Sequence, residues 1–198
     1  TDTLTATVSI DDPGVINNSQ PVITGTTENL VGETITVTVT DVNGNNQVVT
    51  VVVQPDGTFT TPPLDPLPDG PIVIEVVAID PNGDPVSDTI GANIHTIAPV
   101  VTINELPDSA SQTVVINGSV SGISAGDDVT ITVTDSAGQV QTFVTQVDEQ
   151  GNWSITTEAL AEGLYTVLAS AVDAAGNEGT DTENGLVDLT APVINIDP

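Results

Sequence analysis

The sequence predicts an all-β protein that consists of two tandem seven-stranded Greek-key β-sandwiches arranged end to end. Its 198 residues include 30 Val, 30 Thr and 17 Ile, residue types that suit the pleated, half-buried surface of a strand. Gly, Pro, Asn and Asp stand between the apolar stretches, as turn residues do. A third observation, an internal repeat, sets the number of domains.

The repeat is clearest where one copy ends and the next begins. Residues 97–103 (IAPVVTI) return as residues 190–196 (TAPVINI), a shift of 93 positions. Further pairs in the same frame are 34–41 with 128–135, 57–59 with 151–153, and 78–83 with 171–176. The predicted domains are therefore residues 1–97 and 98–191, and residues 192–198 begin a following repeat or a tail. Because the chain begins at Thr1 rather than Met, we expect it to be a piece of a longer protein.

Each copy is predicted to hold about seven short strands. In the first copy these are residues 8–10, 21–26, 34–40, 47–54, 58–61, 72–80 and 86–97. The third strand alternates cleanly, with Ile35, Val37 and Val39 on the buried face and threonines on the other. Turn signals such as Asn43-Gly44 and Asn82-Gly83 separate the strands. Seven strands in roughly 95 residues are typical of a Greek-key sandwich.

The few aromatic residues are predicted to fill the two cores. Phe59 and Trp153 occupy the fifth strand of their copies, where each serves as a core anchor. Tyr165 follows Gly163 at the start of the sixth strand, the position of a tyrosine corner, whereas the first copy has Ile72 there. The alternative role for these rings is stacking on a carbohydrate.

Charge and composition exclude several classes of function. The chain has 28 acidic residues, one His and no Lys or Arg, so its net charge is −28. It therefore lacks the cations that a nucleic-acid binder or a protein docked on an anionic membrane needs. It has no Cys for disulfides. Without an apolar run of about 18 residues or a charged-then-apolar N-terminus, neither a membrane span nor a signal peptide is expected.

Catalysis is also disfavoured. The single His95 lies in a predicted linker, and the chain offers no Cys nucleophile and no Lys for a Schiff base or a phosphate loop. Only a pair of carboxylates remains, as in glycosidases, and among 28 acids some pair falls at a suitable spacing by chance. We therefore expect that the chain is not an enzyme.

Three segments carry a family resemblance: residues 188–194 (DLTAPVI), 163–167 (GLYTV) and 171–177 (AVDAAGN). With them the chain resembles the tandem bacterial immunoglobulin-like repeats of RTX-type, type I-secreted surface adhesins. The resemblance covers essentially the whole chain, twice, and implies an immunoglobulin-like sandwich. It also implies a long extender between a cell-surface anchor and distal adhesive domains, outside the cell, with calcium at the junctions and neighbouring repeats of the same chain as partners. We expect the chain to be monomeric.

Calcium also makes physical sense for this composition. A chain with 28 carboxylates and no basic side chain repels itself. Carboxylates gathered in loops at one end of a sandwich call for a hard cation with oxygen ligands, and Ca²⁺ takes about 6–8 of these. The absence of Cys and the single His argue against zinc or copper.

The predicted topology decides which loops share an end of the sandwich. The exit end of the first domain and the entry end of the second should meet at the junction. The candidate ligands there are Asp11, Asp12, Asp41, Asn43, Asp65 and Asp69 in the first domain and Asp127, Asp128, Asp173 and Asn177 in the second. Asp80, Asn82 and Asp84 form the corresponding group at the free N-terminal end.

The junctions themselves align in two columns. One column holds Asp2, His95 and Asp188, and the other holds Asp11, Asn104 and Asp197. The central junction thus carries His95 and Asn104 where the outer junctions carry acids. We expect calcium there to bind more weakly, to use backbone carbonyls, or not to bind, with His95 packed as a linker residue.

Each Asp also has a simpler role as a turn-former, whose side chain bonds its own backbone. Asp56 and Asp148 are predicted to be ordinary surface turns, whereas Asp80 and Asp173 recur at matching positions. Two functions remain: a calcium-stiffened spacer, or a binding module whose exposed loops recognise a carbohydrate or a surface protein. Burial of Trp153 and Tyr165 favours the spacer, and their exposure on one face favours the binding module.

Overall fold

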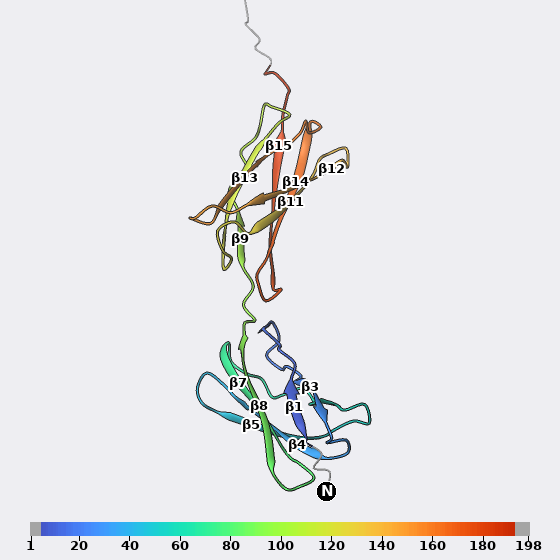
Figure 1. The fold of residues 1–198 in the computed structure, drawn as a ribbon. Coiled ribbons are helices and arrows are strands. Elements are labelled where there is room, and N and C mark those ends of the chain that lie inside the picture. The colour runs from blue at the N-terminus through green and yellow to red at the C-terminus, as the bar shows by residue number, and fades with distance from the viewer. Residues whose placement is uncertain (1–4, 193–198) are drawn as a thin grey trace, which may run out of the picture. The chain divides into compact units, whose positions relative to one another are not determined.

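The computed structural model describes residues 5–192 and confirms an all-β chain (Figure 1). The chain divides between Ile97 and Ala98 into two compact units, unit 1 and unit 2. Among the described residues, no helix is long and apolar enough to span a membrane.

Unit 1 is a sandwich of a three-stranded and a five-stranded sheet. The first sheet has the order β1-β3-β6, and the second has the order β2-β8-β7-β4-β5. The strands are β1 (Thr7–Ile10), β2 (Val15–Ile16), β3 (Thr24–Glu28), β4 (Thr34–Thr40), β5 (Asn46–Val52), β6 (Thr58–Thr60), β7 (Gly70–Ile79) and β8 (Pro85–Ile94).

Unit 2 repeats this arrangement. One sheet has the order β13-β10-β9 and the other β12-β11-β14-β15. The strands are β9 (Val100–Ile103), β10 (Val115–Ser121), β11 (Asp128–Thr134), β12 (Val140–Gln146), β13 (Asn152–Thr156), β14 (Gly163–Val172) and β15 (Glu178–Val187). All pairs between these strands are antiparallel, as in a Greek-key sandwich.

Each unit has its own core, built from alternate strand positions. In β4, Ile35, Val37 and Val39 are buried and the threonines between them face outward, as predicted. Phe59 is fully buried in unit 1, and Trp153 (3% exposed) and Tyr165 (1% exposed) are buried in unit 2. Packing in the core, rather than stacking on a ligand, is therefore the role of these rings.

The first strand region of unit 1 differs from the prediction. The sequence suggested one strand there, whereas β1 pairs with β3 and a separate β2 pairs in parallel with β8 of the other sheet. Between them the chain turns at Asp12 and Gly14: the Gly14 N–H donates to Asp12 Oδ1 at 2.9 Å, and Gly14 has a φ of 58°. This turn carries the chain from one sheet to the other, and two-residue β2 is too short to show periodicity.

A glycine lies beneath each large ring. Gly25 of β3 pairs with Phe59 of β6, and Gly118 of β10 pairs with Trp153 of β13. A Cβ on Gly25 or Gly118 would come 2.5 Å from the facing ring. Gly185 of β15 pairs with Tyr165 in the same way. These glycines leave room for the rings, a role that the sequence alone did not reveal.

Candidate functional site

The turn between β7 and β8 holds three predicted ligands, Asp80, Asn82 and Asp84. The N–H groups of Asn82 and Asp84 donate to Asp80 Oδ1, both at 2.8 Å, and the Asn82 side-chain amide donates to Asp80 Oδ2 at 3.1 Å. These donors, led by the Asp84 N–H, hold the pKa of Asp80 below its ordinary value of 3.8. The Asp80 carboxylate therefore organises its own turn.

The matching turn of unit 2, between β14 and β15, has the same geometry. The N–H groups of Ala175 and Asn177 donate to Asp173 Oδ1 at 2.9 and 2.8 Å, and the Asn177 side-chain amide donates to Asp173 Oδ2 at 2.9 Å. Asp173 Oδ1 thus accepts two N–H groups, and the Asp173 carboxylate organises its own turn as Asp80 does.

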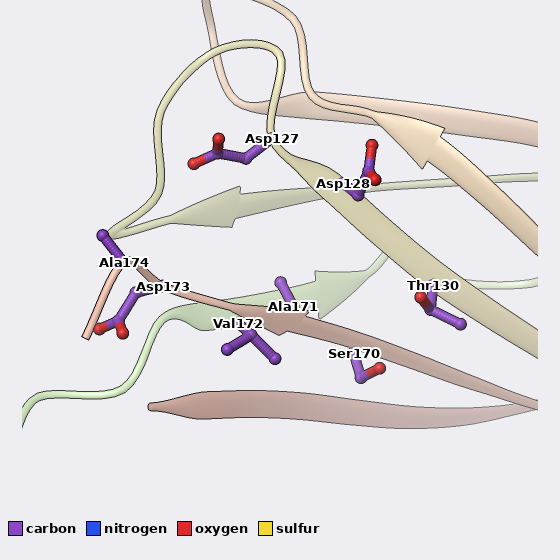
Figure 2. Close-up of a pocket in the computed structure, with 8 residues that line it drawn as sticks. All are labelled: Asp127, Asp128, Thr130, Ser170, Ala171, Val172, Asp173 and Ala174. Atoms are coloured by element: carbon purple, nitrogen blue, oxygen red, sulfur yellow. The ribbon is translucent and has the colours of Figure 1, made fainter. Parts of the chain in front are cut away.

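Asp173 shares a hollow with two other acids (Figure 2). Asp127 and Asp128 lie where the chain enters β11, and Asp173 lies at the end of neighbouring β14. The hollow has a volume of about 380 Å³ and is lined also by Thr130 and Ser170. Asp128 and Asp173 therefore lie at the same end of unit 2. Asp127 accepts the Ser124 N–H at 2.8 Å, and the negative charges around one hollow repel each other unless a cation separates them.

The donor chemistry of this hollow fits Ca²⁺, but its geometry fits only in part. Carboxylate and hydroxyl oxygens are the ligands that Ca²⁺ prefers. Within residues 5–192, however, no three acidic or His side chains approach closely enough to hold one ion together. Water would have to complete the coordination shell, as in weak extracellular sites.

Three predicted ligands of unit 1 already accept hydrogen bonds, and no two of them share a donor. The Thr24 hydroxyl donates to Asp11 Oδ2 at 2.7 Å, and Asp12 accepts from Gly14 as described above. Asp69 accepts the N–H and the hydroxyl of Thr96, at 3.0 and 2.8 Å. These bonds, led by the Thr96 N–H, lower the pKa of Asp69, and the charge of His95 adds to the effect.

The remaining candidates are at the ends. Asp188 Oδ1 accepts the Thr190 N–H at 2.9 Å, the geometry of an Asx turn. Asp2 and Asp197 lie outside the described residues. Asp56 and Asp148 close their own turns, as predicted: Asp56 accepts from Thr58, and Asp148 accepts from Gln150 and Asn152.

Sequence reasoning missed two acids that connect the sheets of each sandwich. Asp88 Oδ2 on β8 accepts the Ile10 N–H of β1 at 2.8 Å, and Asp181 Oδ2 on β15 accepts the Ile103 N–H of β9 at 2.7 Å. The two positions are 93 residues apart, the interval of the repeat. An acid recurring inside a strand was the available signal. These carboxylates satisfy backbone donors that no neighbouring strand reaches.

The predicted tyrosine corner is wrong. The Tyr165 hydroxyl is buried and has no hydrogen-bond partner in the part of the chain that the structure describes. Its ring covers Gly185 instead. Burial raises the pKa of Tyr165, and the negative charge of Asp108 raises it further.

The strand order of unit 2 agrees with a family match. A family model described as a bacterial Ig-like domain matches residues 117–189, which run from β10 past the end of β15. Unit 2 is a bacterial Ig-like domain. The resemblance to bacterial Ig-like repeats is thereby confirmed, and the match includes the hollow of the Ig-like domain and its Asp173 turn. No curated protein matches the chain.

Three solved structures of adhesion proteins are similar to this chain. A tetra-tandem repeat in the extending region of a large adhesion protein is 32% identical, with 94% of this chain and 50% of that chain covered and a TM-score of 0.45. A Ca²⁺-stabilised adhesin that helps an Antarctic bacterium reach out and bind ice is 26% identical, with 93% and 49% covered and a TM-score of 0.46.

The third structure concerns host cell surface retention of a 1.5-MDa bacterial ice-binding adhesin. It is 23% identical, with 96% of this chain and 67% of that chain covered and a TM-score of 0.44. The chain thus spans about half the length of the first two relatives. Because the TM-scores are low, the Ig-like assignment rests on the strand order and the family match.

Proposed function

We propose that the chain is an extender segment of a large bacterial cell-surface adhesin, whose tandem Ig-like domains hold distal adhesive domains away from the cell. The observation that carries the proposal is repetition: the same sandwich occurs twice at an interval of 93 residues, each copy with its own closed core. Repeated self-contained sandwiches add length to a chain without adding a new site.

The proposed location is outside the cell, in an RTX-type adhesin exported by a type I secretion system and active in biofilms. The charge of −28 supports this location, because it keeps the segment soluble and repels it from anionic cell surfaces. The proposed partners are neighbouring repeats of the same chain, and the segment itself is monomeric and without catalytic activity.

We further propose that Ca²⁺ stiffens the domain ends and junctions. The support is the hollow of unit 2, which Asp127, Asp128 and Asp173 line together and where no cationic side chain lies. When bound there, Ca²⁺ would neutralise their mutual repulsion. Asp173 would hold the end of β14 to the ion while its turn hydrogen bonds remain in place.

The test is thermal unfolding in Ca²⁺ and in chelator. The chain has one Trp and one Tyr, both in unit 2, so Trp153 fluorescence reports that unit alone. We expect Ca²⁺ to raise the melting temperature, because a ligand of the folded state stabilises it by about 2.7 kcal/mol at a hundredfold excess over its Kd. Asp173→Asn should remove most of this increase.

Asp148→Asn is the matched control, because Asp148 closes a turn of the same geometry outside the hollow. It should leave the calcium-dependent increase intact. Equal melting temperatures in Ca²⁺ and chelator would refute the calcium site. Small-angle scattering addresses stiffness separately, since an unchanged maximum dimension on chelation would refute stiffening while leaving the extender role standing.

The alternative function is a binding module that recognises a carbohydrate or a surface protein through exposed loops. It is the weaker candidate, because the rings of Trp153, Tyr165 and Phe59 are all buried and form no exposed stacking platform.

A further inference from the structure

Four Asn-Gly pairs occur in the sequence, and the structure places them in two different settings. Asn43-Gly44 and Asn82-Gly83 lie in hairpin turns, whereas Asn117-Gly118 and Asn184-Gly185 lie within strands β10 and β15. In all four pairs the Asn is exposed. The glycines differ: Gly44 and Gly83 are exposed, and Gly118 and Gly185 are buried.

An Asn-Gly pair is able to modify itself in water. The backbone nitrogen of the glycine attacks the side-chain carbonyl carbon of the Asn and forms a five-membered succinimide ring. The bond from that carbon to the side-chain nitrogen breaks, and the nitrogen leaves as ammonia with the proton of the glycine amide. Water then opens the ring at either carbonyl to give Asp or isoaspartate. The step requires free space around the glycine nitrogen and a mobile Asn side chain.

The two strand pairs are held more tightly than the turn pairs. The Trp153 ring lies against Gly118 and the Tyr165 ring against Gly185. The Asn side chains are also held: the Asn104 amide donates to Asn117 Oδ1 at 2.6 Å, and the Thr166 hydroxyl donates to Asn184 Oδ1 at 2.9 Å. Strand pairing also fixes the backbone of both pairs, so the succinimide ring can form only when the sheet opens locally.

The two turn pairs are open. An added Cβ at Gly44 or Gly83 would meet no atom within 4 Å, so space for a ring exists on both. Each turn is held only by bonds within itself: the Gly44 N–H donates to the Asp41 carbonyl and the Gly83 N–H to the Asp80 carbonyl, both at 2.9 Å, and the Asp41 and Asp80 side chains accept further N–H groups of the same turns. An exposed turn opens far more often than a paired strand.

We propose that Asn43 and Asn82 are sites of spontaneous deamidation in the folded protein, and that the rings of Trp153 and Tyr165 protect Asn117 and Asn184. Asn43 converts first, because its side chain has no hydrogen bond within residues 5–192. Asn82 converts more slowly, since its amide donates to Asp80 Oδ2. Unit 2 has Ala137 and Ala175 at the matching turn positions, so the modification is confined to unit 1.

The consequence is an increase in negative charge with age. Each conversion adds one acid, so two conversions take the net charge from −28 to −30. Where Asn82 becomes Asp, the five-residue turn from Asp80 to Asp84 carries three carboxylates instead of two.

The experiment incubates the folded two-unit protein at mildly alkaline pH and maps peptides by mass spectrometry, with Trp153 fluorescence recorded to show that unit 2 stays folded. We expect the mass gain of deamidation at Asn43 and then at Asn82, and none at Asn117 or Asn184. Asn43→Gln and Asn82→Gln should each remove the product at their own position only. Similar rates at all four pairs would overturn the proposal.

Two further arms test the cause. Ala137→Asn creates an Asn-Gly pair in a unit 2 turn whose Gly138 N–H bonds the Asp135 carbonyl at 3.0 Å, and it should deamidate like Asn43. In concentrated urea, all four natural pairs should convert at similar rates, because the rings no longer cover the glycines. If Ala137→Asn gave no deamidated product, or if Asn117 stayed unmodified in urea, the position of an Asn-Gly pair in a turn or a strand would not determine its deamidation rate, and the proposal would be wrong.

Discussion

Asp41 of unit 1 and Asp135 of unit 2 occupy the same turn after the third predicted strand, yet their carboxylates accept hydrogen bonds from different parts of the chain. Asp41 accepts bonds only from its own turn, from Asn43 and Asn45. Asp135 does the same with Ala137 and Gln139, and its second oxygen also accepts the Ala161 N–H at 3.0 Å. Asp135 is accordingly buried and Asp41 is not.

The difference has a covalent cause. The residue of unit 1 that corresponds to Ala161 is Pro68, which has no N–H to donate. One proline therefore leaves the Asp41 carboxylate in solvent, and one alanine lets Asp135 connect two segments. The pairing of a strand glycine with a large ring, Gly25 with Phe59 and Gly118 with Trp153, is kept in both units. Features that depend on a neighbour's donor change with that neighbour.

The largest expected effect tests a feature that the units share. In Gly118→Ala the new Cβ meets the Thr102 carbonyl and the Trp153 ring, so the strand or the ring must shift. We expect a loss of about 3 kcal/mol in the free energy of unfolding, the upper end of the range for overpacked cores. Urea unfolding followed by Trp153 fluorescence measures it.

Gly138→Ala is the control for that substitution. Gly138 has a φ of 79° and open space around it, so alanine there introduces backbone strain of about 1–2 kcal/mol and no clash. Gly25→Ala should repeat the large effect in unit 1, seen by circular dichroism. A Gly118→Ala protein as stable as the Gly138→Ala protein would show that the ring does not need the glycine.

A smaller effect is expected at the acids that connect the sheets. Asp181→Ala leaves the Ile103 N–H without its acceptor and should reduce the free energy of unfolding of unit 2 by about 1–2 kcal/mol. Asp88→Ala should do the same to unit 1. Glu183→Ala, at an exposed position of the same strand as Asp181, should change stability by less than about 0.5 kcal/mol. Equal effects of the two unit 2 substitutions would mean that Asp181 acts only as a surface charge.

The smallest effect concerns pH and returns to Asp41 and Asp135. Both carboxyls have a pKa below the ordinary 3.8, through the Asn45 side chain for Asp41 and the Ala161 N–H for Asp135. As the pH falls, these carboxyls bind protons in the unfolded chain before they do so in the folded protein. The two carboxylates therefore stabilise the folded protein above pH 3.8, and this stabilisation is lost as the pH falls through the folded-state pKa.

The measurement is melting temperature against pH for Asp135→Asn and Asp41→Asn. Asp135→Asn should lower the melting temperature at neutral pH, and the gap to the unsubstituted protein should narrow below pH 3.8. Asp41→Asn should produce a smaller gap, because Asp41 connects no second segment. Ala161→Pro, which copies Pro68, should reduce the effect of Asp135→Asn; an undiminished effect would refute the role given to the Ala161 N–H.

Much of the fold was predictable because it depends on local alternation. The boundaries of β4 follow directly from the apolar and threonine positions of residues 34–40. By contrast β2, with only Val15 and Ile16, has no period to detect, and its place is set by a partner strand some 80 positions later.

The candidate site divides in the same way. The turn geometry of Asp80 and Asp173 follows from short-range bonds that the sequence signals through Gly83 and Gly176. The bonds of Asp88 and Asp181 reach across 78 positions and depend on how two sheets pack, which no local pattern records. The pairing of ligands across the junction remains a prediction.

In each unit a segment near the start of the unit lies parallel to its last strand, and this pairing affects how the unit responds to tension. In unit 1 the parallel pair is β2 and β8, where His95 N–H donates to the Ile16 carbonyl at 2.8 Å. In unit 2, Ser109 N–H donates to the Leu186 carbonyl at 2.8 Å and Asp188 N–H to the Ser109 carbonyl at 2.9 Å. A force that draws the two ends of a unit apart slides these parallel segments past one another. The hydrogen bonds between them are then loaded at the same time instead of breaking one after another.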